Sequence, residues 1–379
     1  MTAELVLTNA RIVLEDSVIH GSVQIRDGGI ADVSEGSVRV GEDFDGDYLV
    51  PGLVELHTDH LEQHYSPRPG VRWNTTAAIQ AHDAQVATSG ITTVFDCLRM
   101  GADEDGGFAR GEMREMADAI QAASRDGRLR SEHFIHLRCE VSADNVMEHF
   151  VDFENDPHVK LVSLMDHAPG QRQFQTMGQY TLYYQKKRGL SDEAFAAFVA
   201  KRQAESARNS TPHRIAISQV CADRRITVAS HDDATLAHVD EAIENGVRLA
   251  EFPTSFDAAR ASHEAGMSVL MGAPNVVRGL SHSGNIAARD LAERGVLDVL
   301  SSDYVPLSLL HAPFVLADEV EGISLPKALA MVTATPARTV GLDDRGRIDT
   351  GLRADLVRVH REHGVPVARA VWRNGRRVA

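Results

Sequence analysis

The sequence predicts an α/β protein, built as a (β/α)8 TIM barrel with a small β-sandwich domain formed by the N- and C-terminal segments. Two observations favour this fold. Strand and helix patterns alternate along the middle of the 379-residue chain, and such alternation is typical of a parallel sheet covered by helices. The two ends of the chain instead show short strand patterns separated by turns. A doubly wound open sheet is the alternative architecture for the middle segment.

The two ends of the chain share one pattern. Strand candidates lie at 5–7, 10–14, 22–25 and 29–33 near the N-terminus, and at 354–359 and 368–373 near the C-terminus. Turn signals such as Asp27-Gly28-Gly29 separate them. We therefore expect residues 1–48 and 346–379 to form the small β-sandwich domain, and residues 49–345 to form the barrel.

The middle of the chain offers one strand for each position of an eight-stranded barrel. The candidates are 49–57, 91–97, 134–141, 159–167, 226–232, 248–253, 267–274 and 297–303. Several are dense in apolar and β-branched residues, as strands buried on both faces should be. Helical patterns separate most of them, at 111–124, 191–206, 236–245 and 283–294. Strand and helix units in this number and order fit a closed barrel.

Composition narrows the classes of function. Hydrophobic residues make up 43% of the chain and charged residues 25%, which is ordinary for a soluble globular protein. We find no run of apolar residues long enough for a membrane span, and no secretory signal at the N-terminus. Three scattered cysteines suggest reduced thiols and a cytoplasmic protein. The net charge of −15 argues against general nucleic-acid binding but leaves an anionic small substrate open.

Residues of the kinds that bind metals gather at the ends of the predicted strands. His57 and Asp59 end the first strand and, being two residues apart, point to the same side. Further ligand-type residues end the third, fourth, fifth and eighth strands: Glu140, His167, His231 and Asp303. Active sites of barrels lie at these ends, and imidazole with carboxylate suits divalent transition metals. The sequence therefore predicts a metal centre at this end of the barrel.

The residue types also indicate a mechanism. Two divalent ions close together can hold a water molecule and lower its pKa. Asp303 is suited to take the proton from this water and deliver it to a leaving group, so we predict that it is catalytic. Glu140 is the candidate ligand that bridges the two ions. Zn²⁺ is the favoured ion, and Mn²⁺, Fe²⁺ and Ni²⁺ are alternatives. Asp166, Asp232 and Asp233 lie beside the ligands and are candidates to orient them.

Nine further histidines are predicted to be structural, because an isolated histidine is more often solvated or part of the core than a ligand. This expectation covers His60, His64, His82, His133, His136, His149, His238, His263 and His311.

Longer motifs of the chain resemble the amidohydrolase superfamily, in which a split β-sandwich accompanies a metal-dependent barrel. They lie at 51–59, 64–71, 81–85, 137–140, 165–174, 230–235, 250–254, 271–279, 281–285 and 301–304. Within the superfamily, they resemble the diphosphatases of phosphonate metabolism, in the carbon–phosphorus lyase pathway. The resemblance runs from about Pro51 to about Leu356.

The resemblance implies a hydrolase that removes diphosphate from the 5-triphosphate of a ribosyl phosphonate and leaves the 5-phosphate sugar. A metal-activated water would attack phosphorus. By the same resemblance, the metal site consists of His57, Asp59, Glu140, His167, His231 and Asp303. One departure stands out: the superfamily usually takes its two lone histidines from the fifth and sixth strands, whereas His167 and His231 end the fourth and fifth candidates.

A triphosphate substrate requires donors besides the metal ions. Arg68 lies in the first strand-end loop, and Arg172 follows a Pro-Gly turn after the fourth strand. A third group follows the seventh strand and leads into a helix: Arg278, Ser281, His282 and Asn285. Loops after strand seven of a barrel and helix N-termini often bind phosphate. We therefore expect these six residues to bind the substrate.

Two other functions remain open. The chain could cleave a C–N bond in a cyclic amide or imide, since the same metal-activated water performs that reaction; arginines in the strand-end loops favour phosphate instead. It could also be a non-catalytic barrel that serves as an assembly subunit, although all the expected ligand positions are filled. We expect an anionic small molecule as the partner, no nucleic acid, no membrane, and a homodimer.

Overall fold

The computed structural model describes residues 4–101, 110–172, 181, 191–279, 285–362 and 364–379. The chain divides into two compact units. Unit 1 consists of Met1–Asp96, Asp118–Phe134 and Met271–Ala379, and unit 2 of Cys97–Ala117 and Ile135–Leu270.

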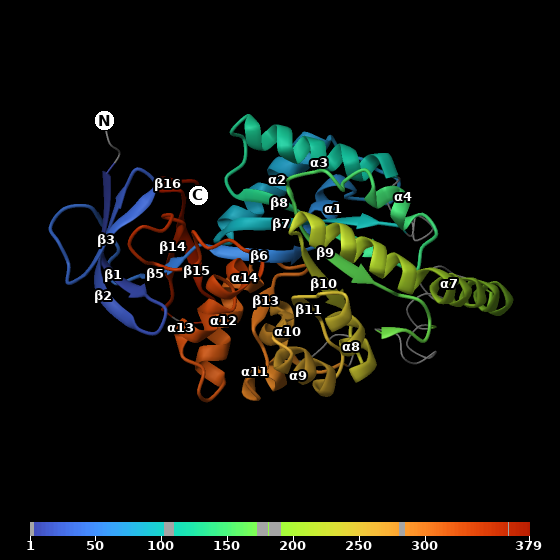
Figure 1. Ribbon diagram of the computed structural model, residues 1–379. Coiled ribbons are helices and arrows are strands. Elements are labelled where there is room, and N and C mark those ends of the chain that lie inside the picture. Colours follow the sequence, from blue (N-terminus) through green and yellow to red (C-terminus); the bar gives the residue numbers. More distant parts are fainter. Residues whose placement is uncertain (1–3, 102–109, 173–180, 182–190, 280–284, 363) are drawn as a thin grey trace. The chain divides into compact units, whose positions relative to one another are not determined.

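Unit 1 contains a mixed sheet built from both ends of the chain (Figure 1). Its strands are β1 (Glu4–Val13), β2 (Val18–Arg26), β3 (Gly29–Glu35), β4 (Glu42–Asp43), β5 (Tyr48–Pro51), β14 (Leu356–His360), β15 (Val367–Arg373) and β16 (Arg376–Arg377). The order is β16-β15-β14-β5-β1-β2-β3, and β4 pairs with β1. The antiparallel pairing of β5 with β14 joins the two ends of the chain. The prediction that both ends form one β unit is confirmed.

The core of this sheet forms because its strands alternate buried and exposed side chains. Phe44 and Trp372, which come from opposite ends of the chain, stack with ring centroids 5.9 Å apart. Both are buried, together with Ile12 and Leu356. Such an aromatic pair contributes about 1 kcal/mol beyond the burial of its surface.

The barrel strands follow one another in sequence order in a single sheet. They are β6 (Leu53–Thr58), β7 (Ile91–Met100), β8 (Glu132–Glu140), β9 (Val159–Met165), β10 (Thr227–His231), β11 (Leu249–Glu251), β12 (Ser268–Gly272) and β13 (Val299–Ser301). A parallel bridge between Thr58 and Asp303 connects the end of the first of them to the segment after the last. The predicted barrel is therefore confirmed; a doubly wound sheet would reverse its strand order at a switch point.

The first predicted strand, 49–57, is divided in the structure. β5 ends at Pro51 in the terminal sheet, and β6 begins the barrel at Leu53. The break falls at Gly52, where a β-carbon would lie 2.2 Å from Thr92 Oγ1. Only glycine allows the backbone to approach another chain segment so closely. Gly52 therefore lets the chain pass from one sheet to the other.

A helix lies at each predicted position, although the one predicted at 283–294 begins only at residue 288 among the described residues. Unit 1 contains α1 (His60–Tyr65), α2 (Thr75–Thr88), α10 (Ala273–Arg278), α11 (Ala288–Glu293), α12 (Ser308–Glu319), α13 (Leu325–Ala330) and α14 (Ala334–Thr339). Unit 2 contains α4 (Val146–Phe150), α7 (Asp192–Arg224), α8 (Leu236–Glu244) and α9 (Phe256–Glu264), and α3 (Arg110–Arg125) has residues in both. α7, predicted as 191–206, has Ser191 as its N-cap and continues past Pro212 to Arg224. Among the helices of the described segments, none has the length and apolarity to cross a membrane.

Candidate metal centre

In unit 1, the end of β6 lies beside the segment that follows β13. The Asp59 N–H donates to the Asp303 carbonyl at 3.0 Å, and the Asp303 N–H donates to the His57 carbonyl at 3.1 Å. His57 is buried and Asp303 is half-buried. The structure thus brings the backbones of three predicted ligands together at the strand ends.

Asp303 has a left-handed backbone conformation, with φ of 53°. This conformation is unfavourable for residues other than glycine, although aspartate tolerates it better than most. Such backbone strain is often found at functional sites. Here the two hydrogen bonds to the end of β6 hold the strained residue in place.

Glu55, which was not singled out from the sequence, supports this part of the site. Its carboxylate is fully buried and accepts the His57 N–H at 2.7 Å and the Ser302 N–H at 2.5 Å. Burial raises the pKa of Glu55 to about 8. The carboxyl group therefore ties the ligand strand β6 to the end of β13. The available signal was an acidic residue within an otherwise apolar strand, two residues before His57.

In unit 2, Glu140 ends β8 and contacts His167. Glu140 Oε2 lies 2.6 Å from His167 Nδ1, and Oε1 accepts the His167 backbone N–H at 3.0 Å. Ser142 Oγ also donates to Oε1, at 2.6 Å, and an Arg202 guanidinium nitrogen lies 3.6 Å from it. Burial alone would raise the pKa of Glu140, but the charges of His167 and Arg202 hold it well below its usual range. Glu140 is therefore an ionised ligand candidate.

His167 follows β9 and His231 ends β10, the fourth and fifth strands of the barrel sheet. The count made from the sequence is therefore right. The two rings meet edge to face with centroids 5.6 Å apart. His167, His231 and Asp232 each offer one ligand atom, and these atoms lie within 4.8 Å of one another. Two imidazoles and a carboxylate at this spacing are a donor set that suits a transition-metal ion.

Asp232 also orients His231. Its Oδ2 lies 2.8 Å from His231 Nδ1, a contact that fixes the ring and leaves Nε2 as the candidate ligand atom. Burial would raise the pKa of Asp232, but His231 holds it below its ordinary value. The residue has φ of 58°, so its backbone is left-handed, like that of Asp303. Asp166 is fixed differently, by the hydroxyls of Ser206 and Ser210 on α7 at 2.8 and 2.7 Å.

Arg172 is buried beside two carboxylates. Its side chain is only 3% exposed, and its guanidinium contacts the carboxylates of Asp233 and Glu241. Burial lowers the pKa of Arg172 to about 9. Two carboxylates thus compensate its charge, and the guanidinium holds Asp233 in place. That Arg172 also binds the substrate stays a prediction.

The other predicted substrate-binding residues are placed only in part. Arg68 and Arg278 are exposed, and Arg278 is the last residue of α10. Asn285 is half-buried. Ser281 and His282 lie outside the described residues.

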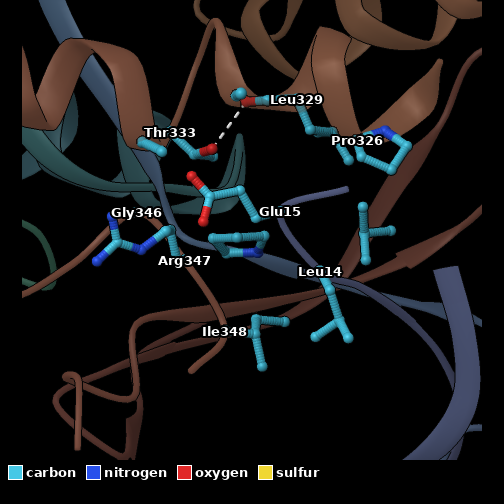
Figure 2. A pocket seen from close by; sticks show the side chains of 12 residues that line it. Leu14, Glu15, Pro326, Leu329, Thr333, Gly346, Arg347 and Ile348 are labelled. Carbon is cyan, nitrogen blue, oxygen red and sulfur yellow. Dashed lines mark hydrogen bonds between the residues drawn. The ribbon is translucent and has the colours of Figure 1, made fainter. Parts of the chain in front are cut away.

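A small pocket of unit 1 is separate from these residues (Figure 2). It is lined by Leu14 and Glu15 after β1, by Leu329 and Thr333 near α13, and by Ile348. Its volume of about 20 Å³ is enough for a water molecule but not for a sugar phosphate. Thr333 Oγ1 donates to the Leu329 carbonyl at 2.8 Å in its wall. This pocket therefore does not qualify as the substrate site.

Comparison with known proteins gives one family. Residues 48–377 match the Amidohydrolase family. The chain is 46% identical over 377 residues to the alpha-D-ribose 1-methylphosphonate 5-triphosphate diphosphatase of Escherichia coli strain K12, with 99% of this chain and 100% of the relative covered. Among solved structures, it resembles an N-acetyl-D-glucosamine-6-phosphate deacetylase from Mycobacterium smegmatis, with a TM-score of 0.64, 16% identity and 99% of both chains covered. It also resembles a dihydropyrimidinase from Brevibacillus agri, with a TM-score of 0.62 and 12% identity over 99% and 95% of the two chains. These two structural likenesses show the fold.

Proposed function

The chain belongs to the amidohydrolase family and is a hydrolase, and we propose that it hydrolyses α-D-ribose 1-methylphosphonate 5-triphosphate in phosphonate metabolism. The observation that carries the proposal is the full-length identity of 46% to a diphosphatase of that name. The donor sets at the strand ends support it, because hydrolysis of a phosphoanhydride requires an activated water and compensation of phosphate charge.

The reaction consumes one water and breaks the bond between the α- and β-phosphates. Diphosphate leaves, and the sugar keeps its 5-phosphate and its phosphonate. Divalent ions at the site would lower the pKa of a water molecule and compensate the negative charge of the triphosphate. We propose that the ligands of these ions are His57, Asp59, Glu140, His167, His231 and Asp303.

The residues of the chain then have distinct tasks. Asp303 accepts the proton of the attacking water and returns it to the departing diphosphate oxygen. Asp232 holds the His231 ring through Nδ1, and Glu140 does the same for His167. The proposed donors to the phosphate and phosphonate oxygens are Arg68, Arg172, Arg278, Ser281, His282 and Asn285.

The proposal also covers the metal ions, the cellular compartment, the binding partner and the assembly of the enzyme. We propose two ions per site, with Zn²⁺ favoured over Mn²⁺, Fe²⁺ and Ni²⁺. The three cysteines are buried thiols, which agrees with a cytoplasmic protein. The partner is an anionic small molecule rather than a nucleic acid, and the assembly is a homodimer. The division into domains at 1–48 with 346–379 and at 49–345 stays a prediction.

Phosphorus NMR of the ribosyl triphosphate with metal-loaded protein tests the proposal. We expect diphosphate to appear while the phosphonate resonance persists. An unchanged spectrum from protein with bound metal would overturn the proposal. Turnover of dihydropyrimidine or hydantoin rings by the same sample would then favour the C–N hydrolase. Inactivity toward both classes would favour the non-catalytic barrel.

A further inference from the structure

Three histidines of unit 1 gather at a place that the proposed reaction does not use. His60 and His64 lie one turn apart on α1, so they share one face of the helix. His82 lies on α2. The ring centroids are 5.4 Å apart for His60 and His64, 6.4 Å for His60 and His82, and 6.0 Å for His64 and His82. One ligand atom from each lies within 4.8 Å of the other two.

A structural role was predicted for each of these histidines, but the sequence did not show that three of them lie together. Nδ1 of His60 and Nδ1 of His82 are buried, and neither has a hydrogen-bond partner among the residues that the structure describes. The His82 residue is fully buried and His60 is 8% exposed. Buried polar atoms of native proteins are nearly always paired. Two such atoms in neighbouring rings are the kind of group that an electron-pair acceptor would bind.

The surroundings of His82 leave Nδ1 with its lone pair. His82 Nε2 lies 2.9 Å from Asp96 Oδ1, and the other oxygen of Asp96 lies 2.7 Å from His133 Nδ1. His133 Nε2 in turn lies 3.3 Å from Asp83. Burial opposes the charge of His133, but Asp96 and Asp83 outweigh it and raise the pKa of His133 to about 9. Asp96 is thus a carboxylate paired with a cation, and it accepts the N–H of His82 Nε2.

His64 has the same kind of support. Its Nε2 lies 3.2 Å from the side-chain oxygen of Gln85, a residue of α2. An amide oxygen can only accept, so His64 Nε2 carries the proton and Nδ1 keeps the lone pair. Burial and the neighbouring His82 lower the pKa of His64. Carboxylates or amides behind histidine rings are typical of metal sites, because they fix the tautomer and the orientation of each ligand.

We propose that His60, His64 and His82 bind a divalent transition-metal ion of the zinc type, at a site additional to the centre formed by the strand ends. Three neutral imidazoles suit Zn²⁺, Co²⁺ or Ni²⁺, whereas Mg²⁺ and Ca²⁺ require oxygen ligands. Zn–N bonds of about 2.0–2.1 Å place tetrahedral ligand atoms about 3.4 Å apart, so a small movement of the rings closes the site. A water molecule takes the fourth position beside the half-buried His64.

Two alternative interpretations of this cluster fit less well. The first is an anion site, but an anion would face the lone pairs of the ring nitrogens rather than N–H donors. His82, Asp96 and His133 also have ligand atoms close together. However, His133 uses both ring nitrogens to contact carboxylates, so it has no lone pair for an ion. The proposal does not depend on the substrate assigned to the enzyme.

The number of zinc ions bound per chain tests the proposal directly. The full-length protein is loaded with Zn²⁺, dialysed against a zinc buffer and analysed by mass spectrometry of the metal, with circular dichroism to confirm folding. We expect His64→Gln to contain one zinc ion fewer per chain than the wild type. His263→Gln, which changes another half-buried helical histidine outside the cluster, should keep the wild-type content. Equal zinc in all three folded proteins would overturn the proposal.

A measurement on the unchanged protein covers the case in which His64→Gln does not fold. Anomalous diffraction at the zinc edge from zinc-loaded crystals should show a peak among the rings of His60, His64 and His82. A peak at the cluster of His167 and His231 without one among those three rings would contradict the proposal.

Discussion

Glu140 and His167 are joined twice: the side-chain contact is 2.6 Å, and the carboxylate also accepts the His167 backbone N–H at 3.0 Å. The first contact fixes the imidazole, and the second fixes the turn after β9 that carries it. Glu140 therefore determines both the position and the tautomer of His167, whether or not its carboxylate also contacts an ion.

Replacing Glu140 with glutamine should weaken metal binding. The amide keeps the shape but loses the negative charge, so we expect metal affinity to fall at least roughly 100-fold and activity to fall with it. Metal titration followed by a diphosphate-release assay measures both. Glu244→Gln, at the exposed end of α8, is the control and should behave like the wild type. Unchanged metal affinity in Glu140→Gln would exclude the proposed role.

Replacing Asp303 with asparagine should act on the rate more than on substrate binding. Loss of a general base typically lowers kcat by about 10²–10⁴-fold. We therefore expect a large fall in kcat with a small change in KM for the ribosyl triphosphate. Asp290→Asn on α11 is the matched control. If kcat of Asp303→Asn stayed within a few fold of the wild type, Asp303 would not be the base.

Because of the buried pair of His133 and Asp96, the free energy of unfolding should decrease as the pH becomes alkaline. The pKa of His133 is raised in the folded protein to about 9, from about 6.5 in an unfolded chain. Its contribution is therefore fully present below pH 6.5 and is lost as the pH rises through 9. The loss should be on the order of 3 kcal/mol in the free energy of unfolding.

Urea unfolding between pH 6 and pH 9.5 tests this dependence by comparing the wild type with His133→Gln. We expect the stability advantage of the wild type to shrink toward alkaline pH. If the two stability curves ran parallel over that range, His133 would not be the titrating group.

Replacing Gly52 with alanine should destabilise unit 1. The new β-carbon would lie 2.2 Å from Thr92 Oγ1, so a backbone segment or the threonine must move. We expect the free energy of unfolding to fall by about 1–3 kcal/mol. Gly111→Ala is the control, because a β-carbon there meets no atom within 4 Å. Equal stability of the two variants in urea would show that the break between β5 and β6 has room to relax.

The sequence was sufficient for the order of the strands and for the residues that end them. Those predictions depend on local patterns: an apolar run identifies β6, and His57 follows from its place at the end of that run. The burial of Arg172 was not accessible in this way, since its carboxylate partner Glu241 lies 69 residues further along the chain.

The role of Glu55 and the histidine cluster were missed for the same reason. Ser302, which donates to Glu55, is 247 residues away in sequence. The lone pair on His82 Nδ1 follows only from the contact of His82 Nε2 with Asp96 and from the pairing of Asp96 with His133. Local periodicity says which face of a helix or strand is buried, but it does not say which distant polar group meets it there.

The pairing of β5 with β14 has a consequence for synthesis of the chain on the ribosome. Asp47, just before β5, contacts Arg358 of β14, which is made 311 residues later. Until then, the inner edge of β5 exposes unpaired backbone groups of the kind that recruit other strands. A nascent chain that folds during synthesis therefore has an incomplete terminal sheet while the barrel is translated. The sheet is completed only when β14 pairs with β5. A polypeptide truncated before β14 would leave this edge of β5 unpaired, and such an edge can pair with strands of other chains or be bound by chaperones.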